Sequence, residues 1–564
     1  MFIVRTRRQR WVLRGNLSLA ALAFCQVAAA QQPPGAGSQL LQIPAAPVQP
    51  RTAPQMRIEE RTASTPVTSD EVKLRVQSLR VTGSTAFTEP ALVELTGFVA
   101  GSELTLSQLQ AMAEKITGLY RRNGYFAAHA YVPAQEIKDG AVHIAVSEGR
   151  YGAIALRNNT NLSDSIAQGA LDGVNRGDLI LAEPLERHLL LLSDLPGITL
   201  NSTLAPGAVA GTSDLLVEVS PGARVNGSID IDNGGSRFTG RYRIGATVNV
   251  NEPLGLGDVA SLRLLTSGHG LQYARASWQR QLGRGQVGVA YSWLGYELGE
   301  EFAPLGAHGT ARVASVFGRY PLMRSRNSNM YAQLGFDWKT FNDRIDATGS
   351  EIDRKSRVLT ASVFGDRTDA EGGGYTTYFA GLSAGSLDIE TPSARAADAL
   401  TARANGGFSK IVLNATRTQR LGSGPLSIYG SIGGQLASKN LDSSEKLVLG
   451  GTGGVRAYSE GQAYADEGVL VSLELRDDLP RFTSLPGYMQ LVGFVDAASV
   501  TIDHSPWVAG SNHRTLSGAG VGVNWSDPGN FLVRAYYAHT LGGKAAPPYS
   551  DRAGRFYFQL VKYF

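Results

Sequence analysis

The amino-acid sequence predicts a membrane all-β barrel of about 16 antiparallel strands, preceded by two small α+β modules. The barrel is predicted because residues 223–564 hold about sixteen segments of roughly ten residues in which apolar and polar side chains alternate. Turn clusters rich in Gly, Asn, Asp and Pro separate these segments, and we find no convincing amphipathic helix among them. The modules are predicted because strand and helix patterns run twice through residues 72–222.

Length and composition limit the class of protein. At 564 residues, the chain is too long for one ordinary soluble domain. Charged residues make up 18%, below the usual quarter, and 66 residues are glycine. The net charge of +4 and the pI of about 8.9 are mild and spread over the chain, so no nucleic-acid partner is expected. After residue 30, no apolar run reaches the roughly 18 residues that a membrane helix requires.

Residues 1–30 are predicted to be a secretory signal peptide. A basic n-region with five arginines precedes an apolar stretch that ends in Ala28-Ala29-Ala30, a small-residue cleavage site. The mature protein should begin at Gln31 and contain no cysteine, because the only cysteine, Cys25, lies inside the signal. The alternative is a lipoprotein cleaved before Cys25, which the bulky Phe24 disfavours.

Residues 31–71 are predicted to be a Pro-rich linker or a threaded tail. Six prolines between residues 33 and 54 rule out a long helix. The pattern also allows a short helix around Gln55–Ala63.

The first α+β module is predicted over residues 72–149. Val72–Val81 alternates as a strand should, with a slip near Ser78. A helix follows, with Leu109, Met112, Ile116 and Leu119 on one face. Two more strands are predicted at Ala127–Val132 and Val142–Val146.

The second module is predicted over residues 150–222 with the same order of elements. Its strands and helices are expected around Ile154–Leu156, Ser165–Leu171, Glu186–Leu192, Ile198–Leu204 and Leu215–Val219. The two units end alike, in Val146-Ser147-Glu148-Gly149 and Val219-Ser220-Pro221-Gly222, which favours an internal repeat. One larger α+β domain is the alternative.

The barrel is predicted over residues 223–564. In Arg241–Val250, for example, Tyr242, Ile244, Ala246 and Val248 do not share a face with the arginines. Further segments of this kind are Tyr331–Trp338, Val358–Phe364, Tyr375–Leu387, Leu426–Leu436, Leu470–Leu475, Met489–Val500 and Leu532–Leu541. Aromatic residues near segment ends suggest interfacial girdles: Tyr320, Trp338, Tyr429 and Tyr488.

The final segment, Phe556–Phe564, places Phe556, Phe558, Leu560 and Phe564 on one face, which Lys562 interrupts. A signal peptide and many strands with one apolar face indicate a closed sheet in lipid, because lipid offers no partner to unpaired backbone groups. A large secreted β-sandwich or solenoid is the alternative. Such proteins bury their apolar face in a core.

The candidate functional residues lie in two segments of the barrel region. Gly450, Gly451, Gly453 and Gly454 form a loop that can pack closely against other backbone, and it leads into Val455, Arg456, Ala457 and Tyr458. Downstream, Phe494 and Asp496 lie in a strand-like run of apolar residues. A carboxylate in such a strand needs a partner, and the planar fork of Arg456 suits it. Alternatively, Arg456 is a solvated loop cation and Asp496 faces water.

No catalytic, metal or cofactor site is expected. Gly381-Leu382-Ser383-Ala384-Gly385 matches the nucleophile-elbow pattern, but Ser383 lies inside an alternating strand rather than a strand–turn–helix. The eight histidines lack metal-ligand spacing. Gly450–Gly454 lacks the Lys and Ser/Thr of a phosphate-binding loop, so no enzyme activity is predicted.

The sequence resembles the outer-membrane transporters of two-partner secretion, the TpsB proteins of the hemolysin- and filamentous-hemagglutinin-exporter type. Tyr120–Phe126 and Val146–Arg150 look like the first POTRA module, and Leu189–Gly197 looks like the second. Asp232–Arg241 and Asn251–Asp258 are similar to the first barrel strands and hairpin.

Two family motifs carry the resemblance into the candidate site. The Val-Arg-Gly-Tyr tetrad of the inward-folded sixth loop matches Val455–Tyr458, with Ala457 in place of glycine. The Phe-x-Asp-x-Gly strand motif matches Phe494–Ala498, with Ala498 in place of glycine. The resemblance implies a salt bridge between Arg456 and Asp496 inside the barrel.

The resemblance also implies location and partners. The protein would lie in the outer membrane of a Gram-negative bacterium, with two periplasmic POTRA modules that capture an unfolded TpsA-like exoprotein. An N-terminal helix within 31–71 would plug the pore. Outer-membrane lipid, lipopolysaccharide and the barrel-assembly machinery would be further partners. The alternatives are a barrel-assembly insertase of the same superfamily, or a porin with periplasmic domains.

Overall fold

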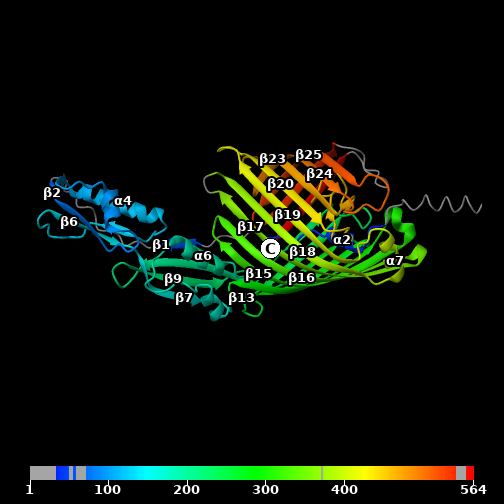
Figure 1. Cartoon of the computed structure of the whole chain (residues 1–564), viewed down its shortest axis with the longest axis horizontal. Helices are drawn as coiled ribbons and strands as arrows, with labels where there is room; N and C mark the ends of the chain where they lie inside the picture. The colour runs from blue at the N-terminus through cyan, green and yellow to red at the C-terminus, as the bar shows by residue number, and fades with distance from the viewer. Residues whose placement is uncertain (1–32, 50–54, 59–71, 370–371, 542–553) are drawn as a thin grey trace, which may run out of the picture.

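The computed structural model describes residues 33–49, 55–58, 72–369, 372–541 and 554–564. The predicted signal peptide and the predicted start at Gln31 lie outside these residues. Two α+β modules lie side by side along the long axis of the molecule, and a β-barrel follows them (Figure 1). In the described parts of the chain, no helix combines the length and apolar character needed to cross a bilayer.

Sixteen antiparallel strands close the barrel, and the last strand pairs with the first. This confirms the predicted fold and strand number. The strands are β10 (Val225–Asp232), β11 (Arg243–Asn251), β12 (Val259–Thr266), β13 (Leu271–Leu282), β14 (Gly285–Glu297), β15 (Ala307–Arg324), β16 (Ser328–Ile345), β17 (Ser350–Asp369), β18 (Gly374–Ile389), β19 (Gly406–Arg420), β20 (Leu426–Ala437), β23 (Glu467–Asp478), β24 (Tyr488–Thr501), β25 (His513–Asp527), β26 (Phe531–Thr540) and β27 (Gly554–Tyr563).

Several strands are longer than the roughly ten residues that we predicted. Strands β15 to β18 have between 16 and 20 residues. Their ends carry charged side chains, such as those of Glu351, Asp353, Arg354 and Lys355, on both faces. The alternating pattern therefore revealed only the middle of each long strand.

Apolar side chains face outward along the strands, as expected for a wall in lipid. Tyr242, Ile244 and Val248 are exposed, whereas Arg243 between them is buried on the lumen side. Phe556, in β27, and Phe564, directly after this strand, are both exposed.

Two sequence-based expectations for the barrel were wrong. Tyr429 is not part of an outer girdle, because it lines the lumen, where the guanidinium of Arg476 lies 4.0 Å from its ring. A short helix, α7 (Pro392–Leu400), interrupts the strands after β18. Pro392 is compatible with the first turn of a helix, and an Ala-rich stretch follows it, so nine residues are helical without a buried face.

The first module contains β2 (Leu74–Val76), β3 (Ser78–Thr82), α3 (Glu89–Thr96), β4 (Ser102–Leu104), α4 (Leu106–Arg122), β5 (His129–Tyr131) and β6 (Ala141–Ser147). Its three-stranded sheet has the order β3-β6-β5. Helix α4 begins with a capping box between Thr105 and Gln108. It buries Leu109 and Ile116, two residues of the helical face that the sequence predicted, against the sheet.

The second module contains β7 (Arg150–Asn158), α5 (Asp164–Gly169), α6 (Ala182–Ser193), β8 (Ile198–Pro206) and β9 (Thr212–Pro221). In the first module, β6 lies between β3, to which it is parallel, and β5, to which it is antiparallel. In the second module, β9 lies in the same way between β7, to which it is parallel, and β8, to which it is antiparallel. Each module has its own buried apolar cluster. The same strand topology thus occurs twice in residues 72–222.

A buried carboxylate, Glu148, completes the first module. It accepts hydrogen bonds from Thr85 N at 2.6 Å, Ala86 N at 2.8 Å and the Tyr120 hydroxyl at 2.9 Å. The guanidinium of Arg150 lies 3.3 Å away. Burial alone would raise the pKa of Glu148, but these hydrogen bonds outweigh it and hold the pKa below its usual value.

Residues 55–58 form a strand, β1 (Gln55–Ile58), where we predicted a short helix. The strand pairs in parallel with β8 of the second module, from Gln55 opposite Asn201 to Ile58 opposite Leu204. A sheet edge elsewhere in the chain therefore sets the conformation of this segment, and no local sequence pattern reports such an edge. The rest of the predicted helix lies outside the described residues.

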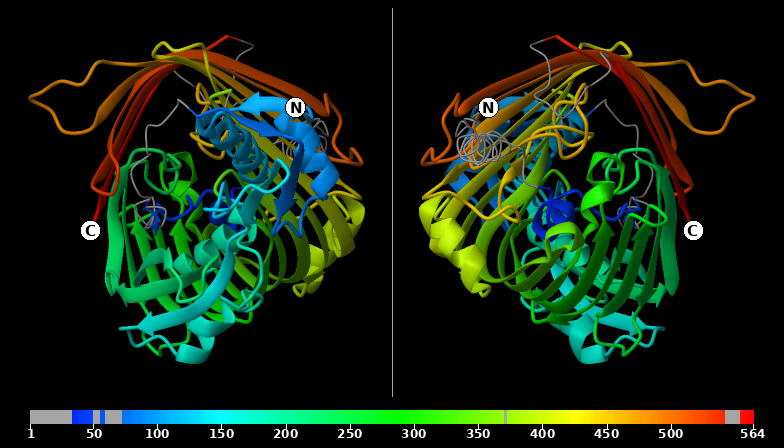
Figure 2. Two further views of the ribbon diagram at one scale, coloured as in Figure 1. Left: turned by 90° about the vertical axis from the view of Figure 1, so that its left-hand side faces the viewer. Right: turned by 90° about the vertical axis from the view of Figure 1, so that its right-hand side faces the viewer.

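A six-residue helix, α2 (Ala36–Leu41), lies inside the barrel against β14, β15 and β16. Seen from either end of the barrel, it lies within the ring of strands, in dark blue (Figure 2). The prolines at 34 and 44 bracket it, so the expectation of no long helix holds and a short one still forms. The chain leaves the lumen near Gln49, which bonds to Gly529 O at 3.1 Å.

The second module is attached to the barrel by ion pairs and close backbone contacts. Arg324, at the end of β15, binds the Asp194 carboxylate at 2.7 and 2.8 Å. Gly197 of the module lies against Glu252, in the turn between β11 and β12. Burial raises the pKa of Glu252 from 4.5 to about 7, and the charge of Asp258 adds to the shift.

Candidate functional site

The loop between β20 and β23, residues 438–466, folds back into the barrel. The short strands β21 (Leu447–Val448) and β22 (Tyr464–Ala465) pair at its base. In the tip, Gly451 N bonds to Tyr458 O at 2.9 Å, and Val455 N bonds to Leu449 O at 2.8 Å. Val455, Arg456, Ala457 and Tyr458 are all buried.

The four loop glycines differ in what they permit. A Cβ on Gly450 would lie 2.1 Å from Ser459 O, and one on Gly454 would lie 2.3 Å from Leu449 O. Gly451 has a φ of +92°, a conformation that side chains disfavour. A Cβ on Gly453 would meet nothing within 4 Å. Three of the four positions therefore require glycine for the tip to keep its shape.

Arg456 and Asp496 are in direct contact. The Arg456 guanidinium donates from Nε to Asp496 Oδ2 at 2.8 Å and from Nη2 to Oδ1 at 2.7 Å, and Arg456 N also bonds to Oδ2 at 3.0 Å. The guanidinium carbon lies 3.5 Å from the centre of the Phe494 ring. Only 7% of Arg456 and 1% of Asp496 are exposed. A bidentate pair this buried fixes the loop tip to strand β24.

The structure adds residues that the sequence analysis did not identify. Arg456 Nη1 donates to Glu474 Oε1 at 2.7 Å, and Nη2 donates to Ser472 Oγ at 2.9 Å. Arg476 binds the other oxygen of Glu474 at 2.7 Å. Ser472, Glu474 and Arg476 alternate along one strand, so in the sequence they are indistinguishable from any polar lumen face. Their partner in a distant loop was the missing information.

The methyl group of Ala457 fits because the residue that it faces in the barrel wall is a glycine. A Cβ on Gly518, in β25, would lie 2.4 Å from the Ala457 methyl group. The methyl group at Ala457 therefore occupies the space that a side chain at Gly518 would need. Ala498 is buried opposite Leu516 and belongs to the same apolar cluster as Phe494.

Two cavities lie in the lumen beside α2 and the residues that follow it. One of about 780 Å³ extends from Gln42 and Ile43 to the Arg456 loop, and acidic and basic side chains line it. The other, of about 410 Å³, lies between Leu40 and the wall at Lys339. The helix and the loop thus divide the space inside the barrel.

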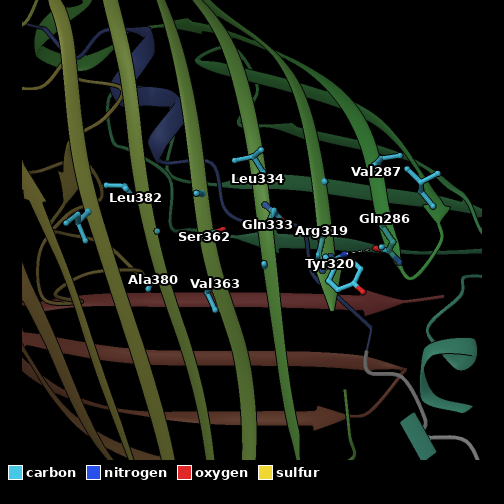
Figure 3. Close-up of a pocket in the computed structure, with 17 residues that line it drawn as sticks. Gln286, Val287, Arg319, Tyr320, Gln333, Leu334, Ser362, Val363, Ala380 and Leu382 are labelled. Carbon is cyan, nitrogen blue, oxygen red and sulfur yellow. Dashed lines mark hydrogen bonds between the residues drawn. The ribbon is translucent and has the colours of Figure 1, made fainter. Parts of the chain in front are cut away.

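A third hollow, of about 760 Å³, lies on the outer wall and is unrelated to the Arg456 loop (Figure 3). The exposed side chains of Leu334 and Leu382 border it, and Gly318, Ala361 and Ala380 form its floor. Its apolar lining is suited to hydrocarbon.

Ser383 lies in the middle of β18, where its hydroxyl bonds to the Thr360 hydroxyl at 2.9 Å. The strand–turn–helix of a nucleophile elbow is absent around it. Among the residues that the structure describes, no group of three or more His, Cys, Asp or Glu side chains could hold a metal ion.

Comparison with known proteins places these features in a family. The model of the family described as haemolysin secretion/activation protein ShlB/FhaC/HecB matches residues 211–525. The model of the ShlB-type POTRA domain matches residues 74–149. The chain is 29% identical over 580 residues to the heme/hemopexin transporter protein HuxB of Haemophilus influenzae strain 86-028NP, covering 100% of both chains. It is 23% identical to the outer membrane transporter CdiB of Dickeya dadantii, over 66% of each chain.

Solved structures agree on the fold. CdiB from Escherichia coli superposes with a TM-score of 0.65 at 20% identity, covering 98% of this chain and 99% of that chain. BamA from Haemophilus ducreyi, lacking POTRA domains 1–3, superposes with a TM-score of 0.54 at 15% identity, over 87% of this chain and 100% of that chain. The chain therefore belongs to the haemolysin secretion/activation family, and it is an outer-membrane transporter of two-partner secretion whose POTRA modules lie in the periplasm.

Proposed function

We propose that the two POTRA modules bind the secreted exoprotein in unfolded form, and that the barrel exports it after α2 and the Arg456 loop move aside. The observation that carries this proposal is the occupied lumen. Helix α2 and the loop fill space that a translocating chain needs, and the loop tip is held through Arg456, which pairs with the buried carboxylates of Asp496 and Glu474. The residues we assign to this gate are Val455–Tyr458, Phe494, Asp496 and the three loop glycines whose positions exclude or disfavour a side chain, Gly450, Gly451 and Gly454.

The edge of the second module supports the capture step. Strand β1 pairs with β8 over four residue pairs. Such pairing tolerates many sequences, because the main chain supplies the hydrogen bonds. An extended exoprotein segment can bind a sheet edge in the same way, whereas a folded exoprotein exposes few unpaired strands.

We further propose that the protein is not an enzyme and uses no nucleotide. Ser383 lies inside strand β18 and not in the strand–turn–helix of a nucleophile elbow. The glycine-rich segment 450–454 is not followed by the Lys and Ser/Thr of a phosphate-binding loop. Folding of the exoprotein outside the cell would bias movement outward. Lipid and lipopolysaccharide would contact the apolar outer wall, and the barrel-assembly machinery would insert the chain.

Export of the exoprotein tests the proposal. Cells carrying the wild type should release it, and Arg456→Ala should insert into the membrane at near-normal levels without releasing it. Gly453→Ala is the matched control, because the added methyl group meets nothing within 4 Å. Normal release by Arg456→Ala would remove the loop from the mechanism.

Deletion of residues 33–49 tests the plug. Single-channel conductance in planar bilayers should rise, because α2 no longer occupies the lumen, while export should persist. An unchanged conductance would reduce this segment to a tether.

The relatives named HuxB suggest a narrower hypothesis. Their name refers to transport of heme and hemopexin, and the likeness spans the whole chain. We propose that the exoprotein of this transporter also takes part in the transport of heme and hemopexin. Growth of a deletion strain with heme–hemopexin as the only iron source tests this point, and undiminished growth would contradict it.

A further inference from the structure

Three charged side chains inside the barrel form a cluster that connects helix α2, the barrel wall and the loop. Arg354, in β17, donates from Nη2 to Asp343 Oδ2 at 2.5 Å. Its other terminal nitrogen, Nη1, binds the Asp442 carboxylate. Asp343 belongs to β16, whereas Asp442 belongs to the first part of the loop. We call Asp343, Arg354 and Asp442 the Arg354 cluster.

The Arg354 cluster also holds α2. Asp343 Oδ1 accepts a hydrogen bond from Ala36 N at 2.7 Å and another from the Tyr296 hydroxyl at 2.7 Å. One carboxylate is thus shared between the helix backbone, a tyrosine and Arg354. Because Arg354 is itself shared with Asp442, a displacement of the loop changes the charge environment of the group that holds the helix.

Helix α2 and the loop also touch directly. A Cβ on Gly37 would lie 2.8 Å from both Ser443 Oγ and Ser444 N. At the other end of the helix, Gln42 Nε2 donates to the Tyr464 hydroxyl at 2.6 Å. The helix therefore packs against both legs of the loop that carries Arg456.

We propose that the Arg354 cluster is a latch that couples α2 to the loop, so that release of one promotes release of the other. Arg354, Asp343 and Asp442 are positioning residues for transport, because they act through the helix and the loop. The inference rests on the proposed function, in which both segments leave the lumen. It adds that they leave together, and coupling of this kind is reciprocal.

A second charged cluster provides the control. Glu445, three residues after Asp442, accepts from Lys339 at 2.6 Å and from Lys410 at 2.9 Å. It fastens the same part of the loop to the wall but makes no bond to α2. Glu445→Gln should therefore loosen the loop without releasing the helix.

Two cysteine reporters measure the helix and the loop separately. Ser38→Cys reports on the helix, and Ala463→Cys reports on the loop, since both side chains are buried and small. The only natural cysteine lies at position 25, in the predicted signal. Each reporter is placed in wild type, Arg354→Ala, Asp442→Asn and Glu445→Gln, and the rate of maleimide labelling is compared among variants that insert equally.

The latch predicts that Arg354→Ala and Asp442→Asn raise labelling of both reporters by roughly tenfold and increase channel conductance. Glu445→Gln should raise labelling of Ala463→Cys only. Gly37→Val removes no charge but pushes the helix off the loop, so by reciprocity it should raise labelling of Ala463→Cys.

Two results would overturn the latch. In the first, Asp442→Asn exposes the loop reporter while the helix reporter and the conductance stay at wild-type values. In the second, Glu445→Gln exposes the helix as much as Arg354→Ala does, which would indicate general loosening. None of these measurements uses the exoprotein. Absence of export by the wild type would therefore refute the proposed function and leave the latch standing.

Discussion

Two buried carboxylates, Glu148 in the first module and Asp496 in the barrel wall, are bound by similar groups but hold different parts of the chain. Glu148 accepts hydrogen bonds from two backbone N–H groups and two hydroxyls, and Asp496 accepts from one of each; both also bind a guanidinium. They are 5% and 1% exposed. The partners of Glu148 belong to its own module or its immediate neighbour. The main partner of Asp496, Arg456, lies in a loop tip 40 residues away in sequence.

The difference shows that the role of a buried ion pair depends on what else fastens its partner. Tyr120 belongs to the module core and Ala86 packs against it, so the loss of Glu148 leaves their donor groups in place with unmet hydrogen bonds. In the proposed mechanism, the loop that carries Arg456 moves away from the wall. Loss of the Glu148 contacts should therefore lower the stability of the module. Loss of the Asp496 contacts should change the position of the loop in the barrel.

The largest expected effect is the loss of export when Arg456 or Asp496 is replaced. Removing one partner leaves an uncompensated charge, which typically costs about 3–5 kcal/mol when buried. Water in the lumen relieves part of this cost, so the loop should move and the barrel should stay folded. Exported protein should fall at least tenfold for Arg456→Ala and for Asp496→Ala, with both at near-normal levels in the membrane.

The double variant sharpens this result. If the two residues act as a pair, the two alanine changes together should cost less than the sum of the single losses. Arg456→Lys should rescue poorly, because an ammonium cannot replace the planar fork. Strictly additive losses would separate the residues, and export by the charge swap Arg456→Asp with Asp496→Arg would show that the charges alone suffice.

The next effect concerns Glu148 and should appear as instability instead of altered gating. Residues 72–222 should fold alone as a soluble fragment, because each module has its own core. In this fragment, Glu148→Gln removes hydrogen bonds to a charged acceptor, each worth about 1.5–3 kcal/mol. Its Tm should fall by about 10 °C or more, measured by circular dichroism. A Tm equal to that of the wild type would refute the comparison drawn here.

The pH dependence of the fragment should be a smaller effect. The pKa of Glu148 is lowered in the fold from its ordinary value of 4.5. Its contribution to stability is therefore present above about pH 4.5 and is lost as the pH falls through the folded value. Urea unfolding of the wild-type fragment should show this loss in acid, and Glu148→Gln should show less of it.

The smallest effect should have the opposite sign and lies at the joint with the barrel. Because burial raises the pKa of Glu252 to about 7, its contribution is present below about pH 4.5 and disappears as the pH rises through 7. Hydrogen exchange of residues 251–258, corrected for intrinsic rates, should be faster at pH 8 than at pH 6. The Glu252→Gln variant should remove the difference, and a wild type without it would refute this assignment.

Sequence periodicity predicted the barrel and the modules, because their elements bury one face over many residues. The Arg456–Asp496 contact was inferred because both residues belong to recognisable motifs. The remainder of the site depends on distant contacts. Glu474 and Arg476 are ordinary polar residues of a strand until the loop meets them, and strand β1 exists only beside β8. Helix α2 is too short to show a helical period, so its burial in the barrel supplies the stability that its sequence lacks.

The seam of the barrel has a consequence for how the chain reaches its folded state. Strand β10 meets β27 over five residue pairs, against eighteen between β16 and β17. At this seam Phe558 N bonds to Asn233 Oδ1 across 325 residues of sequence. Closing so long a stretch of chain carries a large entropic cost that is repaid only at the end, so the final step should be slow. Until the C-terminal strand arrives, one edge of β10 has no pairing partner, and that edge is where a folding catalyst would have to act.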